Sequence, residues 1–465
     1  AFNTAIGYAA GTAVTTGVQN TLIGGLAGDA ITTGASNTAV GYNSLGANTT
    51  GHSNAALGVN TLLLNTTGTQ NTALGMGALV FNQTASNNTA VGFNSLNANT
   101  TGAGNTSVGM DSLKANTTGS GNQAFGKDAL IVNTTGSLNS AYGAGALQAN
   151  TTASNNTAVG YLSLGANTTG ANNTAIGYGA LDANTTAANN TAVGYACLGA
   201  NTTGTSNVAM GFGTLDANTT ASNNTALGYN ALTTNTTGAS NVALGTESLA
   251  SNTTANFNVA IGVNALTTNP DGTENVAVGY NALQAVDGGD SNVGMGNAAG
   301  FAMTGGGNNI FIGKDAGRTG SPGGNITSAS NTLSLGDENI ATANIQVDWT
   351  VASDARDKTD FTALDLGLDF VKALAPVTYK WDKRSKYGDK TADDYDLTSQ
   401  TPDGTHKEDW LDIGFKAQEV EALEIAAGYN KSSKTNLVSS HTGDGKQMGL
   451  QYSKFVPILV KAIQE

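Results

Sequence analysis

Few side chains in this 465-residue chain are suited to chemistry. One Cys excludes a disulfide framework or a Cys-based zinc site, and three scattered His leave little for a His-ligated metal, so we expect no metal and no cofactor. The segment SDARDK (353–358) places a Ser near the start and a Lys at the end of one short stretch. A Ser hydroxyl is a weak nucleophile until a base takes its proton, and a Lys can be that base only if burial or nearby positive charge lowers its pKa. On these residues alone, the commoner arrangement is that Ser353 caps a helix starting near Asp354 and that Lys358 is solvated.

The sequence around this segment predicts the elements that would position it. Residues 331–352 indicate an extended stalk, and residues 382–409 indicate a long polar loop. Apolar residues recur at steps of three and four between Phe361 and Leu374, which predicts an amphipathic helix. Further elements are a strand at 377–381, a strand leading into a helix at 412–423, and a closing helix at 452–465. We therefore expect residues 353–465 to form a small α+β domain.

Composition separates this region from the rest of the chain. Residues 1–330 carry 4 Lys/Arg and 11 Asp/Glu, whereas residues 331–465 carry 15 and 22, and all three Trp lie in the second part. Neither part is basic, which argues against nucleic acid as a partner. No apolar run reaches the roughly 18 residues of a membrane span, so membrane insertion is not expected. The chain begins with Ala and has no signal-peptide pattern, so we expect a processed product or a fragment of a longer protein.

Residues 1–330 form a tandem repeat with a period of seventeen, seen first in the spacing of Asn3, Asn20 and Asn37. Asn recurs at this step as far as Asn292, eighteen times, and Gly stands four positions later in every case. Leu stands eight positions after the Asn in fifteen repeats, and a second Asn stands eleven after it in fourteen. In the repeat NTAVGYNSLGANTTGHS (37–53) these positions are Asn37, Gly41, Leu45 and Asn48.

This unit is too short for a two-helix repeat and too rich in Asn, Thr and Gly for a helix. It predicts a mainly β chain built on a parallel β-solenoid or β-roll, with one short strand and one turn in each coil. The stacked Asn would form side-chain ladders, and the Gly would take a turn that a Cβ forbids. Each coil offers only two or three large apolar side chains. One apolar stripe can fill the coil and another remains to bury against other chains, so we expect three chains side by side.

Four segments, which follow one another along the chain, resemble a known family. SDARDK, GLDFVKALAPVTYKWD, GFKAQEV and YSKFVPILVKAIQE, within about residues 345–465, are similar to the endosialidase-type intramolecular chaperone domain at the C-terminus of phage tail fibres, tailspikes and neck appendages. The repeats more loosely resemble trimeric β-roll rods in such fibres and in YadA-like adhesin heads.

The resemblance implies that three copies of the domain align three chains, guide folding of the preceding β-rich trimer, and then cut themselves off. The cut would fall between Ala352 and Ser353, with Ser353 as nucleophile and Lys358 as its base in a single-turnover, serine-type reaction. Asp354 and Arg356 also match the family's motif, whereas Asp357 stands at a variable position.

These expectations favour a homotrimeric, phage-type tail fibre in a virion, which attaches to a host cell-surface receptor such as a glycan or an outer-membrane component. An alternative is a bacterial surface adhesin or predation fibre with the same chaperone. A minor alternative is an ice-binding solenoid, because the NTT triplets would stack into rows of Thr. A glycan-cleaving enzyme is disfavoured, because such chemistry needs clustered acids and only eleven Asp or Glu are spread over the whole of the repeats.

Overall fold

The computed structural model describes residues 2–340, 342–344, 353–389, 395–432, 435, 437–442 and 444–465. The chain divides into two compact units, Ala1–Asn275 and Val276–Glu465. The two boundaries predicted from the sequence, after residues 330 and 352, both fall inside the second unit. The helices described here are too short or too polar to cross a membrane.

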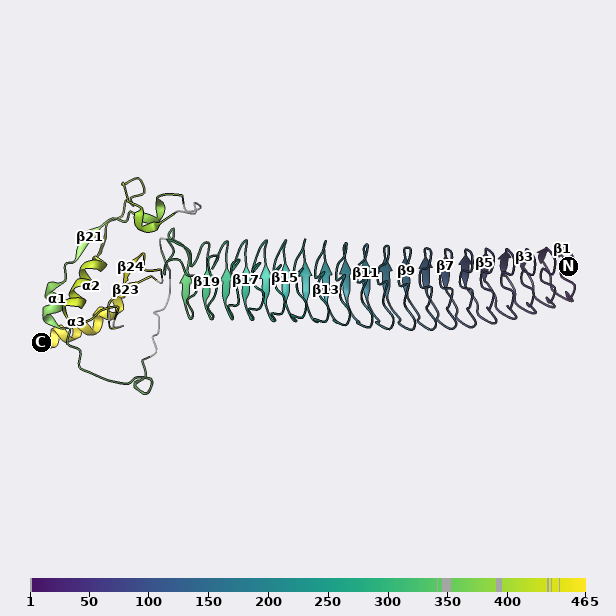
Figure 1. Ribbon diagram of the computed structural model, residues 1–465, viewed down its shortest axis with the longest axis horizontal. Helices are drawn as coiled ribbons and strands as arrows, with labels where there is room; N and C mark the ends of the chain where they lie inside the picture. The colour runs from purple at the N-terminus through teal and green to yellow at the C-terminus, as the bar shows by residue number, and fades with distance from the viewer. Residues whose placement is uncertain are drawn as a thin grey trace. The chain divides into compact units, whose positions relative to one another are not determined.

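The first unit is a stack of coils, each contributing one short strand (Figure 1). Neighbouring strands are parallel and in register, one sequence repeat apart, so that Thr157 pairs with Thr174 and Val159 with Ile176. This confirms the predicted parallel β-solenoid with one coil for each 17-residue repeat. The strands are β1 (Thr4–Ile6), β2 (Thr21–Ile23), β3 (Thr38–Val40), β4 (Ala55–Leu57), β5 (Thr72–Leu74), β6 (Thr89–Val91), β7 (Thr106–Val108), β8 (Gln123–Phe125), β9 (Ser140–Tyr142), β10 (Thr157–Val159), β11 (Thr174–Ile176), β12 (Thr191–Val193), β13 (Val208–Met210), β14 (Thr225–Leu227), β15 (Val242–Leu244) and β16 (Val259–Ile261).

Two ladders of buried Asn side chains connect the coils. Asn37 Nδ2 donates to the Gly51 carbonyl at 2.9 Å, and its Oδ1 accepts from the backbone N–H of Asn54, one coil later, at 3.0 Å. In the second ladder, Asn48 Nδ2 donates to the same Gly51 carbonyl at 3.0 Å, and its Oδ1 accepts from Asn65 Nδ2 at 2.8 Å. A buried amide is costly without hydrogen-bond partners, so this stacking explains how fully buried Asn side chains are tolerated.

The coil interior is narrow. The strand residue Ala39 and the turn residue Leu45 are both fully buried and fill it. Gly41 lies beside them with φ +136°, and a Cβ there would sit 2.4 Å from the carbonyl oxygen of Gly58 in the next coil. Only glycine fits at this spacing, because the clash would be with backbone that cannot move without separating the coils.

A second set of apolar side chains points outward. We call the residues immediately before and after the Gly of each coil the apolar stripe. Tyr178 and Tyr195, which follow the Gly, remain 53% and 51% exposed, and Leu227, which precedes it, is 46% exposed. Aromatic rings stack along the stripe in successive coils with centroids 5.1 to 5.5 Å apart, through Tyr161, Tyr178, Tyr195, Phe212 and Tyr229. The Ala, the Leu and the buried polar side chains thus fill the coil, and the stripe is left uncovered in the single chain.

The second unit begins with four more parallel strands and continues into a small C-terminal region. The strands are β17 (Val276–Val278), β18 (Val293–Met295), β19 (Ile310–Ile312) and β20 (Leu333–Leu335). The step from β19 to β20, where Ile310 lies opposite Leu333, is longer than the other steps, because an irregular loop is inserted in the last coil.

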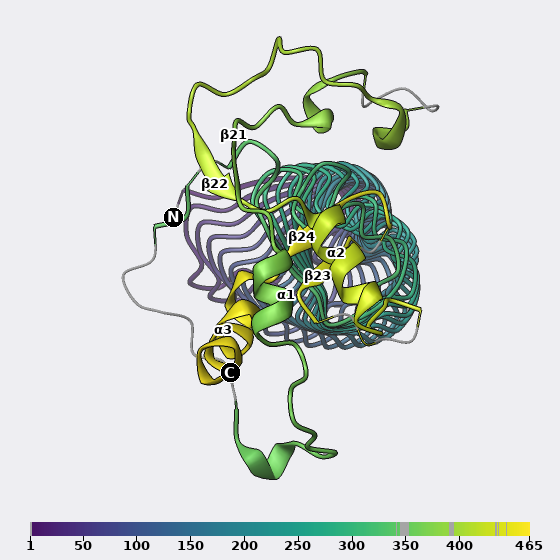
Figure 2. The same ribbon diagram turned by 90° about the vertical axis from the view of Figure 1, so that its left-hand side faces the viewer.

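The described residues of the C-terminal region form three short helices and two small antiparallel sheets (Figure 2). Its helices and strands are α1 (Leu368–Ala373), β21 (Val377–Tyr379), β22 (Asp412–Gly414), α2 (Ala417–Ala426), β23 (Ser439–His441), β24 (Met448–Leu450) and α3 (Phe455–Gln464). Single 3-10 turns are η1 (Ala355–Asp357), η2 (Arg384–Lys386), η3 (Leu397–Ser399) and η4 (Tyr452–Lys454). β21 pairs with β22, and β23 pairs with β24. The predicted α+β class is confirmed.

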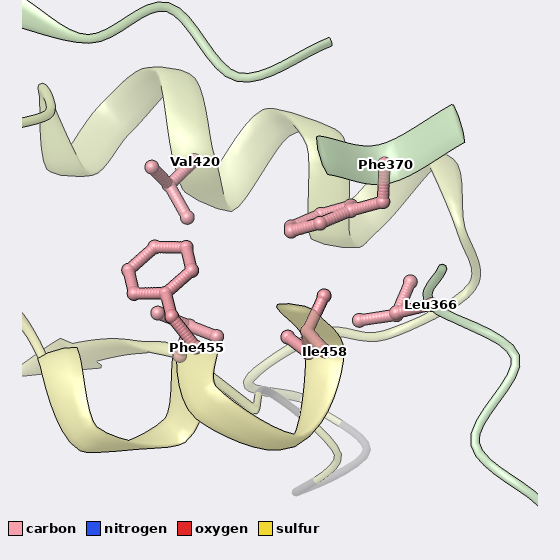
Figure 3. Close-up of a cluster of buried hydrophobic side chains, with 6 residues drawn as sticks. Leu366, Phe370, Val420, Phe455 and Ile458 are labelled. Atoms are coloured by element: carbon pink, nitrogen blue, oxygen red, sulfur yellow. The ribbon is translucent and has the colours of Figure 1, made fainter. Parts of the chain in front are cut away.

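The core of this region lies between the three helices. Figure 3 shows Phe370 of α1, Val420 of α2, and Phe455 and Ile458 of α3 turned toward one another, with Leu366 at the edge of the cluster. The predicted helix over 361–374 is too long, because residues 361–367 form no regular element and α1 begins only after Gly367. Gly is a poor helix former, and the segment ahead of it is too short to nucleate a helix alone.

A buried carboxylate fastens α2 to β23. Glu424 is fully buried, and its Oε1 accepts from the backbone N–H of Leu437 at 2.7 Å. Its Oε2 accepts from the backbone N–H of Ser439 at 3.0 Å. The charge is thus held by hydrogen bonds to backbone donors, which positions the β23–β24 hairpin against the helix.

Candidate functional site

Ser353 and Lys358 contact each other directly. The 3-10 turn η1 lies between them and folds the chain back on itself. Lys358 Nζ donates to Ser353 Oγ at 2.6 Å and lies 3.4 Å from the Ser353 carbonyl oxygen. Both residues are exposed in the single chain.

Asp354 and Arg356 hold the turn in this shape. Asp354 is the N-cap of η1, and its Oδ1 accepts from the backbone N–H of Arg356 at 2.9 Å. The Arg356 guanidinium also donates from Nε to both carboxylate oxygens at 3.1 Å. These hydrogen bonds from Arg356 hold the pKa of Asp354 below its usual value, and the pairing raises the pKa of Arg356. The alternative in which Ser353 caps the helix is not observed, because Asp354 takes that role and the Ser353 hydroxyl faces Lys358.

This arrangement places the Ser353 hydroxyl, which can act as a nucleophile, beside the Lys358 amine, which can act as its base. A neutral Lys amine at hydrogen-bond distance can take the hydroxyl proton, and the alkoxide can then attack a carbonyl. The carbonyl that the sequence points to belongs to Ala352, which lies outside the described residues. The structure therefore brings together Ser353, Asp354, Arg356 and Lys358.

Other reactive side chains are placed unfavourably for chemistry. Cys197 is buried in the solenoid, and burial raises the pKa of its thiol to about 12, so the reactive thiolate is suppressed. Among the residues that the structure describes, no group of three or more His, Cys, Asp or Glu side chains could hold a metal ion. His441 of β23 pairs through Nε2 with Glu421 Oε1 of α2 at 2.7 Å, and both side chains are partly buried.

Sequence reasoning did not identify how η1 is built. The signal was present, because Asp at an N-cap two residues before an Arg is a common local motif. The N-cap was predicted at Ser353 instead, because Ser and Asp are similarly good caps and the two residues are adjacent. The hydrogen bonds of Glu424 were also not foreseen, because they depend on a hairpin that the sequence does not signal.

Residues 353–429 match the sequence model of the family described as chaperone of endosialidase, a family of self-cleaving intramolecular chaperones. The match begins at Ser353 itself and runs through α1, β21, β22 and α2. It supports a chaperone domain at the C-terminus and covers a minor part of the chain. No curated protein matches the sequence.

Proposed function

We propose that the chain is a segment of a homotrimeric fibre for host attachment, carried in a virion as a tail fibre. Its C-terminal chaperone drives folding of the trimer and then cuts the chain between Ala352 and Ser353. The fibre would meet a receptor on the host cell surface, a glycan or an outer-membrane component. The combination of a long repetitive solenoid with a C-terminal chaperone supports this assignment, since a stack of identical coils has no internal signal that aligns three chains.

The observation that carries the proposal is the 2.6 Å contact between Lys358 Nζ and Ser353 Oγ, at the first residue of the family match. In the proposed reaction, Lys358 removes the hydroxyl proton and Ser353 Oγ attacks the Ala352 carbonyl carbon. The C–N bond breaks, the Ser353 amine takes up the proton, and Ala352 is held as an ester on Ser353. Water then hydrolyses the ester, which leaves a carboxylate on Ala352 and a free N-terminus on Ser353.

Assembly would control this step. A Lys amine accepts a proton only in its neutral form, and removal from water favours that form. Both side chains are exposed in the single chain, so packing of three chains around them would supply the change. Cutting would then report that the fibre has assembled.

The apolar stripe supports the trimer. It runs through sixteen coils of the first unit; the position before the Gly holds no charged residue in any of them, and the position after it holds one, Lys127. At about 4.8 Å per coil, that is a column of roughly 75 Å. Monomeric proteins rarely expose a contiguous apolar patch above a few hundred Å². Chains with the same repeat can align their stripes along the whole column, so a second and third copy are the partners that this surface fits.

The mass of the unmodified chain after expression tests the cleavage. We expect two products, a fibre ending at Ala352 and a piece that runs from Ser353 to Glu465. A chain that assembles into trimers and keeps its full mass would contradict the proposed self-cleavage.

Charges placed on the apolar stripe test the trimer. We expect Tyr178→Lys with Phe212→Lys to reduce the native mass from three chains to one, because both residues are half exposed in the single chain and would be desolvated in the trimer. The matched control is Thr186→Lys with Thr220→Lys, which adds the same charges to exposed positions of the same two coils. Native mass spectrometry reads the result. Equal trimer content in both variants would show that the stripe is not the interface.

A further inference from the structure

The end of the solenoid and the C-terminal region touch through a polar interface within the second unit. We call it the docking seam. Its solenoid side consists of Asn325, Asp337, Glu338 and Asn339, and its C-terminal side consists of Lys383, Ser385, Lys386 and Asp444.

Hydrogen bonds cross the seam between residues that the structure describes. Asp444 Oδ2 accepts from the backbone N–H of Asn325 at 3.1 Å. Lys383 Nζ donates to the Glu338 carbonyl at 2.8 Å, and Lys386 Nζ donates to the side-chain oxygen of Asn339.

Burial and charge show that the approach is close. Ser385 and Asp337 are only 3% and 7% exposed. Burial acts to raise the pKa of Asp337, but hydrogen bonds from Asn339 and the positive charges of Lys314 and Lys386 outweigh it and hold the pKa below its usual value. The acidic run at 337–338 therefore faces the basic run at 383–386, and the two sides have complementary charge.

The seam does not depend on the chain that joins its two sides. Asn325, Glu338 and Asn339 precede residue 352, whereas Lys383, Lys386 and Asp444 follow residue 353. A cut between residues 352 and 353 leaves every one of these contacts in place and turns them from contacts within one chain into contacts between two.

We propose that the seam keeps the C-terminal piece bound to the end of the solenoid after the chain is cut, so that cutting and release are separate steps. This inference rests on the proposed self-cleavage. The contacts are polar, and the seam borders a cavity of about 560 Å³ that is lined by Trp381, Glu408 and Gln418. Charged contacts beside open space are screened by ions, so release is controlled by salt. In a trimer three seams act together, which strengthens retention well beyond that of a single seam.

The test separates retention from self-cleavage. In the Ser353→Ala chain, a recognition site for a sequence-specific protease replaces residues 345–350, and the protease makes the cut. Size-exclusion chromatography then follows the C-terminal piece at about 0.1 M and about 1 M NaCl, where the screening length falls from about 10 Å to about 3 Å. We expect the piece to elute with the solenoid at low salt and separately at high salt.

A pair of double variants assigns the effect to the seam. Lys383→Ala with Lys386→Ala removes two of its donors, and we expect the retained fraction at low salt to fall by about tenfold. Lys416→Ala with Lys431→Ala removes the same charge from exposed positions elsewhere in the region, and retention should not change. Two results would overturn the proposal. One is separation of the pieces at low salt in the Ser353→Ala chain that carries the protease site and no Lys substitution. The other is equal retention in the two double variants. Because the protease makes the cut, neither result depends on whether the chain cuts itself.

Discussion

The Ser353→Ala chain is expected to remain at 465 residues under conditions in which the parent chain is fully cut. The substitution removes the Oγ that would attack the preceding carbonyl and leaves the backbone of η1 unchanged. Lys358→Met should slow cutting by about 10²- to 10⁴-fold, the usual contribution of a positioned base, while the nucleophile is retained. The rate is measured by mass spectrometry after assembly, as the appearance of the piece that begins at Ser353.

Two comparisons make this result specific. Lys372→Met removes an exposed Lys from α1 in the same domain and should cut at the parent rate. A small primary amine added to the solution should restore part of the rate in Lys358→Met and none in Ser353→Ala, because only the former still has its nucleophile. Cutting of Lys358→Met at the parent rate would remove Lys358 from the mechanism, and cutting of Ser353→Ala would place the nucleophile elsewhere.

The second large effect concerns the stability of the solenoid. Gly177→Ala is expected to lower the free energy of unfolding by about 3–5 kcal/mol, from backbone strain and from displacement of the next coil. Gly177 has φ +137°, and a Cβ there would lie 2.2 Å from the carbonyl oxygen of Gly194. Urea denaturation followed by circular dichroism measures the loss. Because a repeat stack is held by nearest-neighbour interfaces, the weakened interface should also split the transition into two.

Gly179→Ala is the matched control, two residues away in the same coil. Gly179 also has a positive φ, +60°, but nothing lies within 4 Å of the Cβ that alanine would add. Its cost should be about 1–2 kcal/mol from conformation alone. Similar losses in the two variants would show that backbone conformation, and not the contact between coils, makes Gly177 necessary.

The solenoid could be predicted from the sequence because its physics is local and repeated. Every coil meets a copy of itself, so the spacing of Asn37, Gly41, Leu45 and Asn48 states both the fold and the register. The C-terminal region lacks this redundancy. The hairpin of β23 and β24 was missed because its strands are only three residues long and one of them, Ser439–His441, is polar. The helix α1 was overextended because the apolar spacing continued across Gly367.

Only part of the candidate site could be predicted from the sequence. Ser353 and Lys358 stand close in sequence, so a contact between them needs nothing beyond one turn of chain. Which residue caps that turn was not decided by spacing, since Ser353 and Asp354 are adjacent and chemically suited to the same role. The docking seam could not be predicted from the sequence. It joins Asn325 to Asp444, which are far apart in the chain and show no shared pattern.

Because successive coils share one register, the number of repeats sets the length of the solenoid. Each strand meets the one that lies a single repeat further along the chain, and the hydrogen bonds offered by one coil are the ones that the next accepts. Removing or duplicating the codons of one whole repeat would join two coils that already fit, and would shift everything beyond them by about 4.8 Å. Reach can therefore change in small, equal increments by slippage within the repetitive gene, while each remaining coil still meets a matching neighbour.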